Sequence, residues 1–236
     1  AAGLKSPGLL HDVRTERWLA TVGRNWWAAN RALDRFAPVF ETSGAAVSSD
    51  SITGALELAL KGDGTRIHSR GDIAAAFAGR RLLSGAYRVQ PALHAAIETR
   101  SVTAAPDGSR LRLWVATQAP AQCRAAVAKA TGLAEEAITL FPMPAGGSFG
   151  IALEHDAAVQ AAIIARTIDK PVQLVWSRAE EIMRDLPRAP AQARLTASLN
   201  TAGGIDALAV RIAAPAARHE LTARLVDAAR PDAAQR

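Results

Sequence analysis

The sequence is short of the residue types on which several classes of protein depend. Its 236 residues include one cysteine, Cys123, one tyrosine and two methionines. A disulfide within the chain is therefore impossible, and no iron–sulfur cluster is expected on it, because such clusters need several thiolates. No segment reaches the roughly 20 consecutive apolar residues of a membrane span, and residues 1–11 lack the pattern of a secretion signal. The cytoplasm and the periplasm both stay open as locations.

The basic excess is small and is not gathered into runs. Lys and Arg number 28 against 22 Asp and Glu, for a net charge of +6, and no basic block alternates with aromatic side chains. Nucleic-acid binding is therefore not expected. The chain is 49% apolar and 21% charged, which is typical of a globular protein with enough length for a hydrophobic core.

The first 89 residues predict a small α+β unit made of short elements. In chain order we expect a strand at 17–23, a helix at 25–36 capped by Asn25, a helix at 51–61, a strand at 65–70, a helix at 72–77 and a strand at 80–89. No partner strand is evident before the first strand. We therefore expect this unit to be truncated or shared with another chain.

Clearer patterns follow residue 91. In chain order they predict strands at 94–105 and 110–117 around the turn 106–108, a helix at 122–131, a strand at 135–141, a helix at 154–167, a strand at 171–176, a capped helix from Ser177, strands at 194–199 and 207–213, and a weak helix at 216–229. Cys123 falls among apolar neighbours on one of these helices and is interpreted as a small buried hydrophobe.

A glycine-rich stretch, FPMPAGGSFG at 141–150, joins a predicted strand to a predicted helix. Its glycines permit positive φ and leave no Cβ in the way, so backbone N–H groups can converge there on a phosphate or oxo group. The same pattern also occurs in plain connections between a strand and a helix. The stretch alone does not decide between the two interpretations.

Five phrases place this loop in a wider pattern: YRVQPALHAAIE (87–98), WVATQAP (114–120), GGSFG (146–150), LEHDAAVQAAIIA (153–165) and KPVQLVWSR (170–178). In order and spacing they resemble the large, molybdenum-binding subunit of the xanthine oxidase and aldehyde oxidase family, in the branch typified by isoquinoline 1-oxidoreductase beta subunits. The earlier phrase at 18–36 resembles the last strand and helix of the family's hammerhead domain.

The resemblance implies a fold and a division of the chain. It implies an α+β chain with a partial hammerhead-like α/β unit at 1–85, the first lobe of a molybdopterin-binding domain of the aldehyde oxidase type at 86–213, and a helical tail at 214–236. It also implies molybdopterin, usually as the cytosine dinucleotide, with iron–sulfur clusters on a small partner subunit and the remaining pterin-binding lobe as a further partner.

The resemblance also assigns site residues. Gln118 matches the family glutamine beside an oxo ligand of molybdenum. Gly146, Gly147, Ser148, Phe149 and Gly150 match the loop whose amides approach the metal centre and the pterin, with Phe149 as an aromatic wall near the substrate. No side chain of this chain is expected to bind the metal.

Some residues depart from the family pattern. The family's general-base glutamate has no counterpart here, so no catalytic residue is assigned. Ile151 and Ala152 stand where the branch commonly has basic residues. We therefore expect part of a molybdenum hydroxylase for aldehydes or N-heterocycles, inactive alone; the alternative is a non-catalytic domain of the lineage that binds no molybdenum and acts by association.

Several polar residues have competing interpretations. His94 and Glu98 fall on one face of the predicted strand, either lining a pocket or serving the strand's structure. Glu154, next to the predicted helix start, has a capping or a surface role. Three histidines elsewhere in the chain, His68, His155 and His219, lack the spacing of a metal site.

Overall fold

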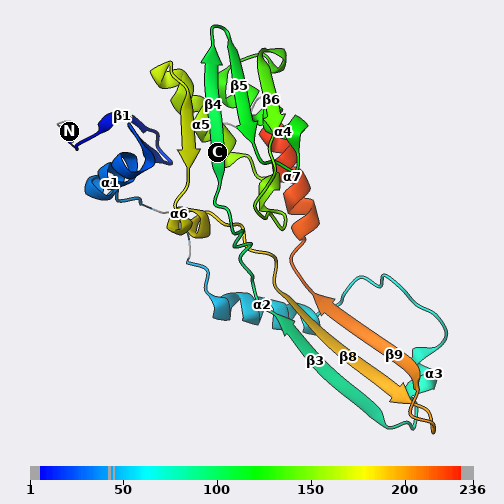
Figure 1. The fold of residues 1–236 in the computed structure, drawn as a ribbon. Helices are drawn as coiled ribbons and strands as arrows, with labels where there is room; N and C mark the ends of the chain where they lie inside the picture. The colour runs from blue at the N-terminus through cyan, green and yellow to red at the C-terminus, as the bar shows by residue number, and fades with distance from the viewer. Residues whose placement is uncertain (1–5, 42–43, 45, 230–236) are drawn as a thin grey trace. The chain divides into compact units, whose positions relative to one another are not determined.

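The computed structural model describes residues 6–41, 44 and 46–229. The chain forms two compact units, which are treated separately below: unit 1 comprises residues 1–42, 94–186 and 221–236, and unit 2 comprises residues 43–93 and 187–220. Figure 1 shows the helices and strands of both. The boundaries predicted after residues 85 and 213 follow the family resemblance and stay a prediction.

A mixed four-stranded sheet is the centre of unit 1, with the strand order β6-β5-β4-β7. Its strands are β4 (Ser101–Asp107), β5 (Arg110–Val115), β6 (Ile138–Pro142) and β7 (Val172–Val175). β4 pairs antiparallel with β5 and β7, whereas β6 runs parallel to β5. The predicted turn between β4 and β5 is confirmed, since Asp107 pairs with Arg110 and Gly108 has a φ of 60°.

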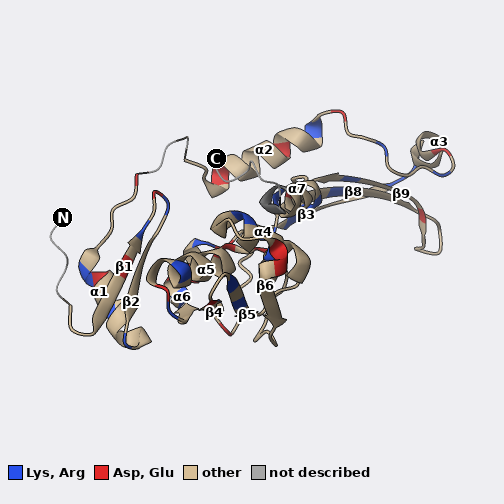
Figure 2. Ribbon diagram, turned by 90° about the horizontal axis from the view of Figure 1, so that it is seen from above, with Lys and Arg blue, Asp and Glu red and all other residues tan. Residues whose placement is uncertain are grey.

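Two helices, α4 (Pro120–Thr131) and α5 (Asp156–Ile168), lie on one side of this sheet (Figure 2). The buried residues of α5 are mostly alanine, and such small side chains let the helix lie close to the strands. Gly132 ends α4 in the left-handed conformation, as predicted. The largest fully buried hydrophobic side chains of this core are Leu111, Leu113, Ile164, Val102, Val127 and Cys123.

An N-terminal hairpin and a helix also belong to unit 1. β1 (Leu9–Arg14) pairs antiparallel with β2 (Leu19–Gly23), and α1 (Trp26–Phe36) follows. The Asn25 side chain accepts a hydrogen bond from the Ala28 N–H, which confirms the predicted cap. The expectation that β2 has no preceding partner strand was wrong. β1 escaped prediction because its sequence, LLHDVR, buries only Val13 and has no alternating apolar pattern.

Unit 2 combines a three-stranded antiparallel sheet with two helices. The strand order is β3-β8-β9, formed by β3 (Leu82–Val89), β8 (Ala191–Leu199) and β9 (Ile205–Ala213). Helix α2 (Ser49–Lys61) packs Leu56 and Leu60 against Ala213. Helix α3 (Ile73–Phe77) is capped by Asp72. The strand predicted at 65–70 was wrong, since that segment pairs with no strand in the described part of the chain.

Two further helices agree with the predictions, α6 (Arg178–Met183) and α7 (Ala217–Ala229). The Ser177 side chain caps α6 by accepting from the Glu180 N–H. The strand predicted at 94–105 begins only at Ser101. Residues 94–100 are irregular, because Ala95 has a φ of 44° and side chains bond to the backbone of this segment. None of the described helices is long and apolar enough to cross a membrane.

Candidate functional site

The glycine loop, residues 146–150, lies at the end of the unit 1 sheet where β5 and β6 both finish. Because these two strands are parallel, the segments that follow them leave the sheet at the same end. The glycine loop follows β6, and Gln118 follows β5. The loop then enters a short 3-10 turn, η2 (Ile151–Leu153), before α5 begins. The topology therefore brings the two predicted site elements together.

Gln118 and Ser148 are in direct contact. The Ser148 hydroxyl donates to Gln118 Oε1 at 2.6 Å, and Ser148 Oγ accepts from the Ala152 N–H at 3.1 Å. The Gln118 backbone N–H donates to Ala152 O at 3.0 Å. These bonds fix the Gln118 amide beside the loop, and its Nε2 is left without a hydrogen-bond partner among the described residues.

A second segment, residues 94–98, runs along the other side of the loop. The Gly146 N–H donates to Glu98 Oε2 at 2.8 Å, and the Glu98 N–H donates to Gly146 O at 3.0 Å. A Cβ added to Gly146 would lie 2.4 Å from Glu98 Cβ, so that one of the two segments would have to shift. A Cβ at Gly147 or Gly150 would make only ordinary contacts, 3.4 Å from Ala96 and 3.5 Å from His94, but both glycines have a positive φ. Gly146 therefore permits the close approach of residues 94–98, which is a role that the sequence did not predict.

The backbone of the loop leaves several donors unused. The φ angles are 105° at Gly147, 56° at Phe149 and 114° at Gly150, so the chain turns repeatedly through left-handed conformations. Within the described part of the chain, the N–H groups of residues 147–150 form no hydrogen bond. Together with Gln118 Nε2 they make a donor-rich surface, which fits the phosphate and oxo groups of a molybdopterin cofactor.

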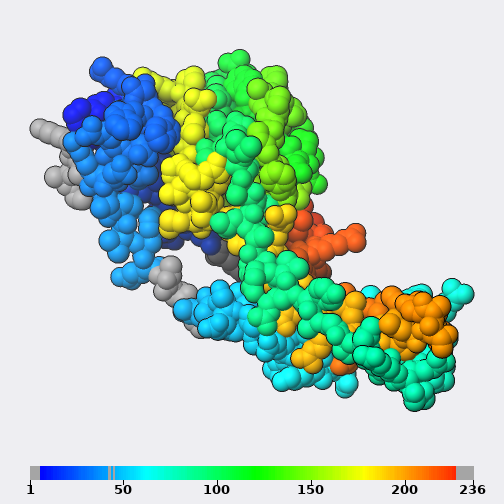
Figure 3. Space-filling model, turned by 60° about the horizontal axis from the view of Figure 1, so that its bottom comes forward, coloured from blue at the N-terminus to red at the C-terminus, as the bar shows by residue number. Residues whose placement is uncertain are grey.

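Two arginines hold the elements behind the loop. Arg178 donates from Nη1 to Ala96 O at 2.6 Å and from Nη2 to Ile97 O at 2.7 Å. Arg100 donates from Nη2 to Ile151 O, directly after the loop. The space-filling view shows the β7 and α6 region (yellow) between the blue N-terminal part and the green atoms of the sheet (Figure 3). The two guanidinium groups thus hold the middle of the 94–98 segment and the turn that follows the loop.

A buried carboxyl lies among these guanidinium groups. Glu181 is 6% exposed, and its Oε2 lies 3.6 Å from Arg178 Nη1. Burial raises the pKa of the Glu181 carboxyl, although Arg178 and Arg100 oppose this shift. Burial also lowers the pKa of Arg100, against the attraction of Glu181. Arg100 and Glu181 line a cavity of about 30 Å³ together with Gly146 and Gly147 of the glycine loop.

Ile151 and Ala152, the departures from the family pattern, are 8% and 3% exposed. They lie in η2, where their carbonyls accept from Arg100 and from Gln118 and their side chains enter the interior. A basic residue would not fit there without burying its charge. Their apolar character is thus required by the position of η2 in this chain.

Cys123, Glu154 and His155, whose roles were predicted from the sequence, lie outside the glycine loop. Cys123 is 1% exposed in the core, which confirms the prediction of a buried hydrophobe, and burial raises the pKa of its thiol to about 12. Glu154 does not cap α5; its Oε1 accepts from Arg224 Nη2 at 3.1 Å. His155 occupies the N-cap position but makes no capping bond, and neither ring nitrogen has a hydrogen-bond partner among the residues that the structure describes.

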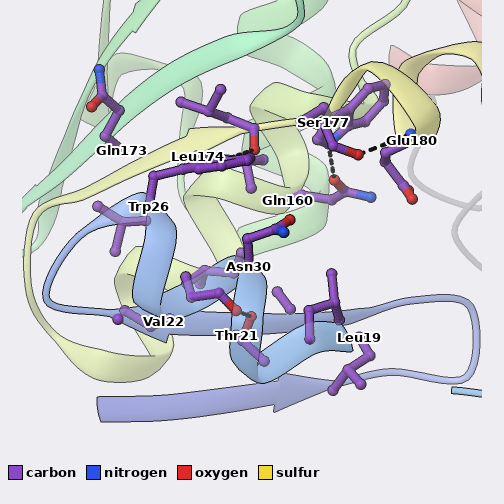
Figure 4. A pocket seen from close by; sticks show the side chains of 18 of the residues that line it. Leu19, Thr21, Val22, Trp26, Asn30, Gln160, Gln173, Leu174, Ser177 and Glu180 are labelled. Atoms are coloured by element: carbon purple, nitrogen blue, oxygen red, sulfur yellow. Dashed lines mark hydrogen bonds between the residues drawn. The ribbon is translucent and has the colours of Figure 1, made fainter. Parts of the chain in front are cut away.

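Sequence reasoning missed a larger pocket within unit 1. A cavity of about 360 Å³ lies between β2 and α1 on one side and β7, α5 and α6 on the other (Figure 4). Trp26 Nε1 donates to Val175 O at 3.2 Å, and Trp176 Nε1 donates to Gln160 Oε1 at 3.0 Å along its wall. The adjacent residues Trp26 and Trp27 are 45% and 63% exposed. Their amphipathic character was the available signal.

The fold matches that of known oxidoreductases. The aldehyde oxidoreductase from Desulfovibrio gigas superposes with a TM-score of 0.60 at 18% identity, over 81% of this chain and 22% of that one. Quinoline 2-oxidoreductase from Pseudomonas putida 86 gives a TM-score of 0.61 at 22% identity, over 81% of this chain and 26% of that one. These similarities define the class of fold, a mixed α/β arrangement found in such enzymes.

The family follows from the sequence itself. The model for the molybdopterin cofactor-binding domain matches residues 60–227, and the chain belongs to this family. It is 28% identical over 211 residues to the beta subunit of isoquinoline 1-oxidoreductase from Brevundimonas diminuta, and 27% identical over 161 residues to a probable xanthine dehydrogenase subunit of Bacillus subtilis. These matches cover 84% and 66% of this chain. The chain spans 27% and 22% of the length of those relatives.

Proposed function

We propose that this chain supplies one lobe of the molybdopterin site in a molybdenum hydroxylase that oxidises aldehydes or N-heterocycles. Family membership and the names of the relatives, which are subunits of such oxidoreductases, support the class. One observation carries the site assignment: Gln118 and the glycine loop lie in contact through Ser148 Oγ and Gln118 Oε1, 2.6 Å apart. Both elements also carry donors without a hydrogen-bond partner in the described part of the chain, namely Gln118 Nε2 and the N–H groups of residues 147–150.

In this proposal the chain's residues bind and orient the cofactor. The N–H groups of residues 147–150 would hold phosphate or pterin oxygens, and Gln118 Nε2 would donate to an oxo group. Ser148 fixes the Gln118 amide by occupying its Oε1. Phe149, which is 65% exposed, would wall the substrate side and exclude water. When bound, the molybdenum cofactor would supply the redox chemistry of substrate oxidation.

The proposal extends to parts of the chain and to its partners. Residues 1–85 would be a partial hammerhead-like unit, and the cofactor would be the cytosine dinucleotide form. An iron–sulfur small subunit and the remaining pterin-binding lobe would complete the enzyme, and that lobe would provide the general base. The relatives' names as subunits support association with other chains.

Metal and pterin analysis of the protein purified from its native host tests this proposal. We expect molybdenum and one pterin for each copy of the chain in the assembled complex. The released pterin is identified after oxidation, which also distinguishes the dinucleotide from the mononucleotide form. A complex that contains this chain but neither molybdenum nor pterin would exclude the proposed function.

A further inference from the structure

His94 is held against the end of the glycine loop by a buried aspartate. Its Nδ1 lies 2.7 Å from Asp185 Oδ1, and its backbone N–H donates to Asp185 Oδ2 at 2.7 Å. The side chains of His94 and Asp185 are 10% and 4% exposed. One carboxylate therefore fixes both the backbone and the ring of this residue, so the orientation of the imidazole is determined by two bonds.

The bond to Asp185 selects one tautomer of the neutral His94 ring. An ionised carboxylate only accepts hydrogen bonds, so Nδ1 must carry the proton that bridges to Asp185. The lone pair of the neutral imidazole is then on Nε2. Asp185 thereby makes Nε2 of His94 a hydrogen-bond acceptor.

The Nε2 atom faces the loop and is unused. A Cβ built on Gly150 would lie 3.5 Å from Nε2, which is the nearest atom to that position. Within the described residues Nε2 has no hydrogen-bond partner, yet it is not sealed in the interior as both ring nitrogens of His155 are. Gly150, with a φ of 114°, leaves space beside it that a side chain would restrict.

We propose that His94 is a ligand-binding residue that accepts a hydrogen bond from an N–H or O–H group of a heterocycle bound at the glycine loop. The inference rests on the proposed function. The loop amides and Gln118 supply only donors, which suit the anionic parts of a cofactor, whereas a nitrogen heterocycle also presents donors of its own. The Glu98 carboxylate lies at the Gly146 end of the loop, and His94 adds an acceptor at the Gly150 end, with Asp185 as its positioning residue.

The variant Asp185→Asn tests this role without removing either contact. The asparagine carbonyl can still accept from the His94 N–H, while its amide donates to Nδ1 and moves the ring proton to Nε2. In this variant Nε2 of His94 is therefore a hydrogen-bond donor instead of an acceptor. We expect the assembled complex to lose bound pterin on dialysis at least tenfold faster than wild type. Nitrogen NMR shifts of the His94 ring in the 236-residue chain report the tautomer, and the melting temperature reports the fold.

Matched variants separate this role from a structural one. Glu180→Gln removes a nearby negative charge, on α6 five residues before Asp185, without touching His94, and should leave pterin retention unchanged. His94→Gln keeps an acceptor near the position of Nε2, whereas His94→Phe keeps only the ring shape. Retention in the glutamine variant and loss in the phenylalanine variant support the inference even if Asp185→Asn fails to fold.

Two results would overturn the proposed ligand-binding role of His94. The first is full pterin retention in Asp185→Asn with the proton shown to be on Nε2. The second is equal loss in His94→Gln and His94→Phe. Wild-type complex that contains no pterin would instead refute the proposed function itself, and is recognised before any variant is made.

Discussion

The Ser148 hydroxyl donates to Gln118 Oε1 at 2.6 Å, although the two residues lie 30 positions apart in the chain. This bond leaves Gln118 Nε2 as the free donor of the amide. Replacing Gln118 by alanine should lower turnover of the assembled enzyme by about 10²-fold, the usual effect of losing one preorganised donor. Because Gln118 is exposed, the melting temperature should change little. Steady-state kinetics and calorimetry measure the two effects, and unchanged turnover would remove the assignment of Gln118.

Because Gly146 lies so close to Glu98, we expect a larger side chain at position 146 to lower the stability of the chain. Gly146→Ala places a Cβ 2.4 Å from Glu98 Cβ, so the loop or the 94–98 segment must shift. We expect the variant to lose about 1–3 kcal/mol of unfolding free energy, as in overpacked sites. Urea denaturation measures the loss.

The control for this variant is Gly54→Ala in α2. An added Cβ at Gly54 meets nothing within 4 Å, and the position is an exposed helix interior. This control should gain about 0.5–1 kcal/mol. A Gly146→Ala variant as stable as wild type would contradict the packing of residues 94–98 against the loop.

The Arg178 guanidinium spans two carbonyls, Ala96 O and Ile97 O, with a fork that lysine cannot reproduce. Arg178→Lys should therefore loosen the 94–98 segment. Hydrogen exchange of the Glu98 amide, which donates to Gly146 O, should become about tenfold faster, equivalent to about 1.4 kcal/mol of local stability. Arg88→Lys, at an exposed pair with Glu57, is the matched control and should leave that amide unchanged.

Much of the fold was predictable because its signals are local. The Asn25 and Ser177 caps, the turn at Gly108 and the end of α4 at Gly132 depend on a few neighbouring residues. Residues 94–100 were mispredicted as a strand because their bonds go to Asp185 and Arg178, more than 80 positions away. No local pattern encodes such partners.

The candidate site was predictable to a similar degree. The resemblance identified Gln118 and the loop, and the parallel pairing of β5 with β6 accounts for their contact. The role of Gly146 toward residues 94–98 was not visible, because it depends on which segment lies beside the loop. The 360 Å³ pocket was missed for the same reason, since its walls come from five separate elements.

The buried thiol of Cys123 should resist modification in the folded chain. With its pKa raised to about 12, only about one thiol in 10⁴ is ionised at pH 8, and the side chain is 1% exposed. Labelling by a disulfide reagent should therefore proceed only as fast as the protein unfolds, and should accelerate in urea. A Cys123→Ala, Ser109→Cys double variant, with its thiol in the exposed β4–β5 turn, should label at once. Equally rapid labelling of the wild-type thiol would contradict its burial.

His155 makes the stability of the chain depend on pH. Burial lowers the pKa of its ring below the ordinary value of 6.5, with Arg100 acting in the same direction and Asp156 opposing it. As the pH falls below 6.5, the unfolded chain binds a proton at this residue that the folded chain does not bind. The contribution of the neutral His155 ring to the free energy of unfolding is therefore fully present above pH 6.5. It is lost as the pH falls below 6.5, by up to about 1.4 kcal/mol per pH unit, until the lowered pKa of the folded chain is reached.

Replacing His155 by leucine removes this dependence of stability on pH. Both ring nitrogens are buried and have no partner in the described part of the chain, so the apolar side chain also removes an unsatisfied polar group. We expect the stability of His155→Leu relative to wild type to rise as the pH is lowered from about 7.5 to about 5.5. His68→Leu, at an exposed position, should keep the wild-type slope. Urea unfolding at several pH values measures the difference, and parallel profiles for wild type and His155→Leu would show that the buried ring does not titrate as expected.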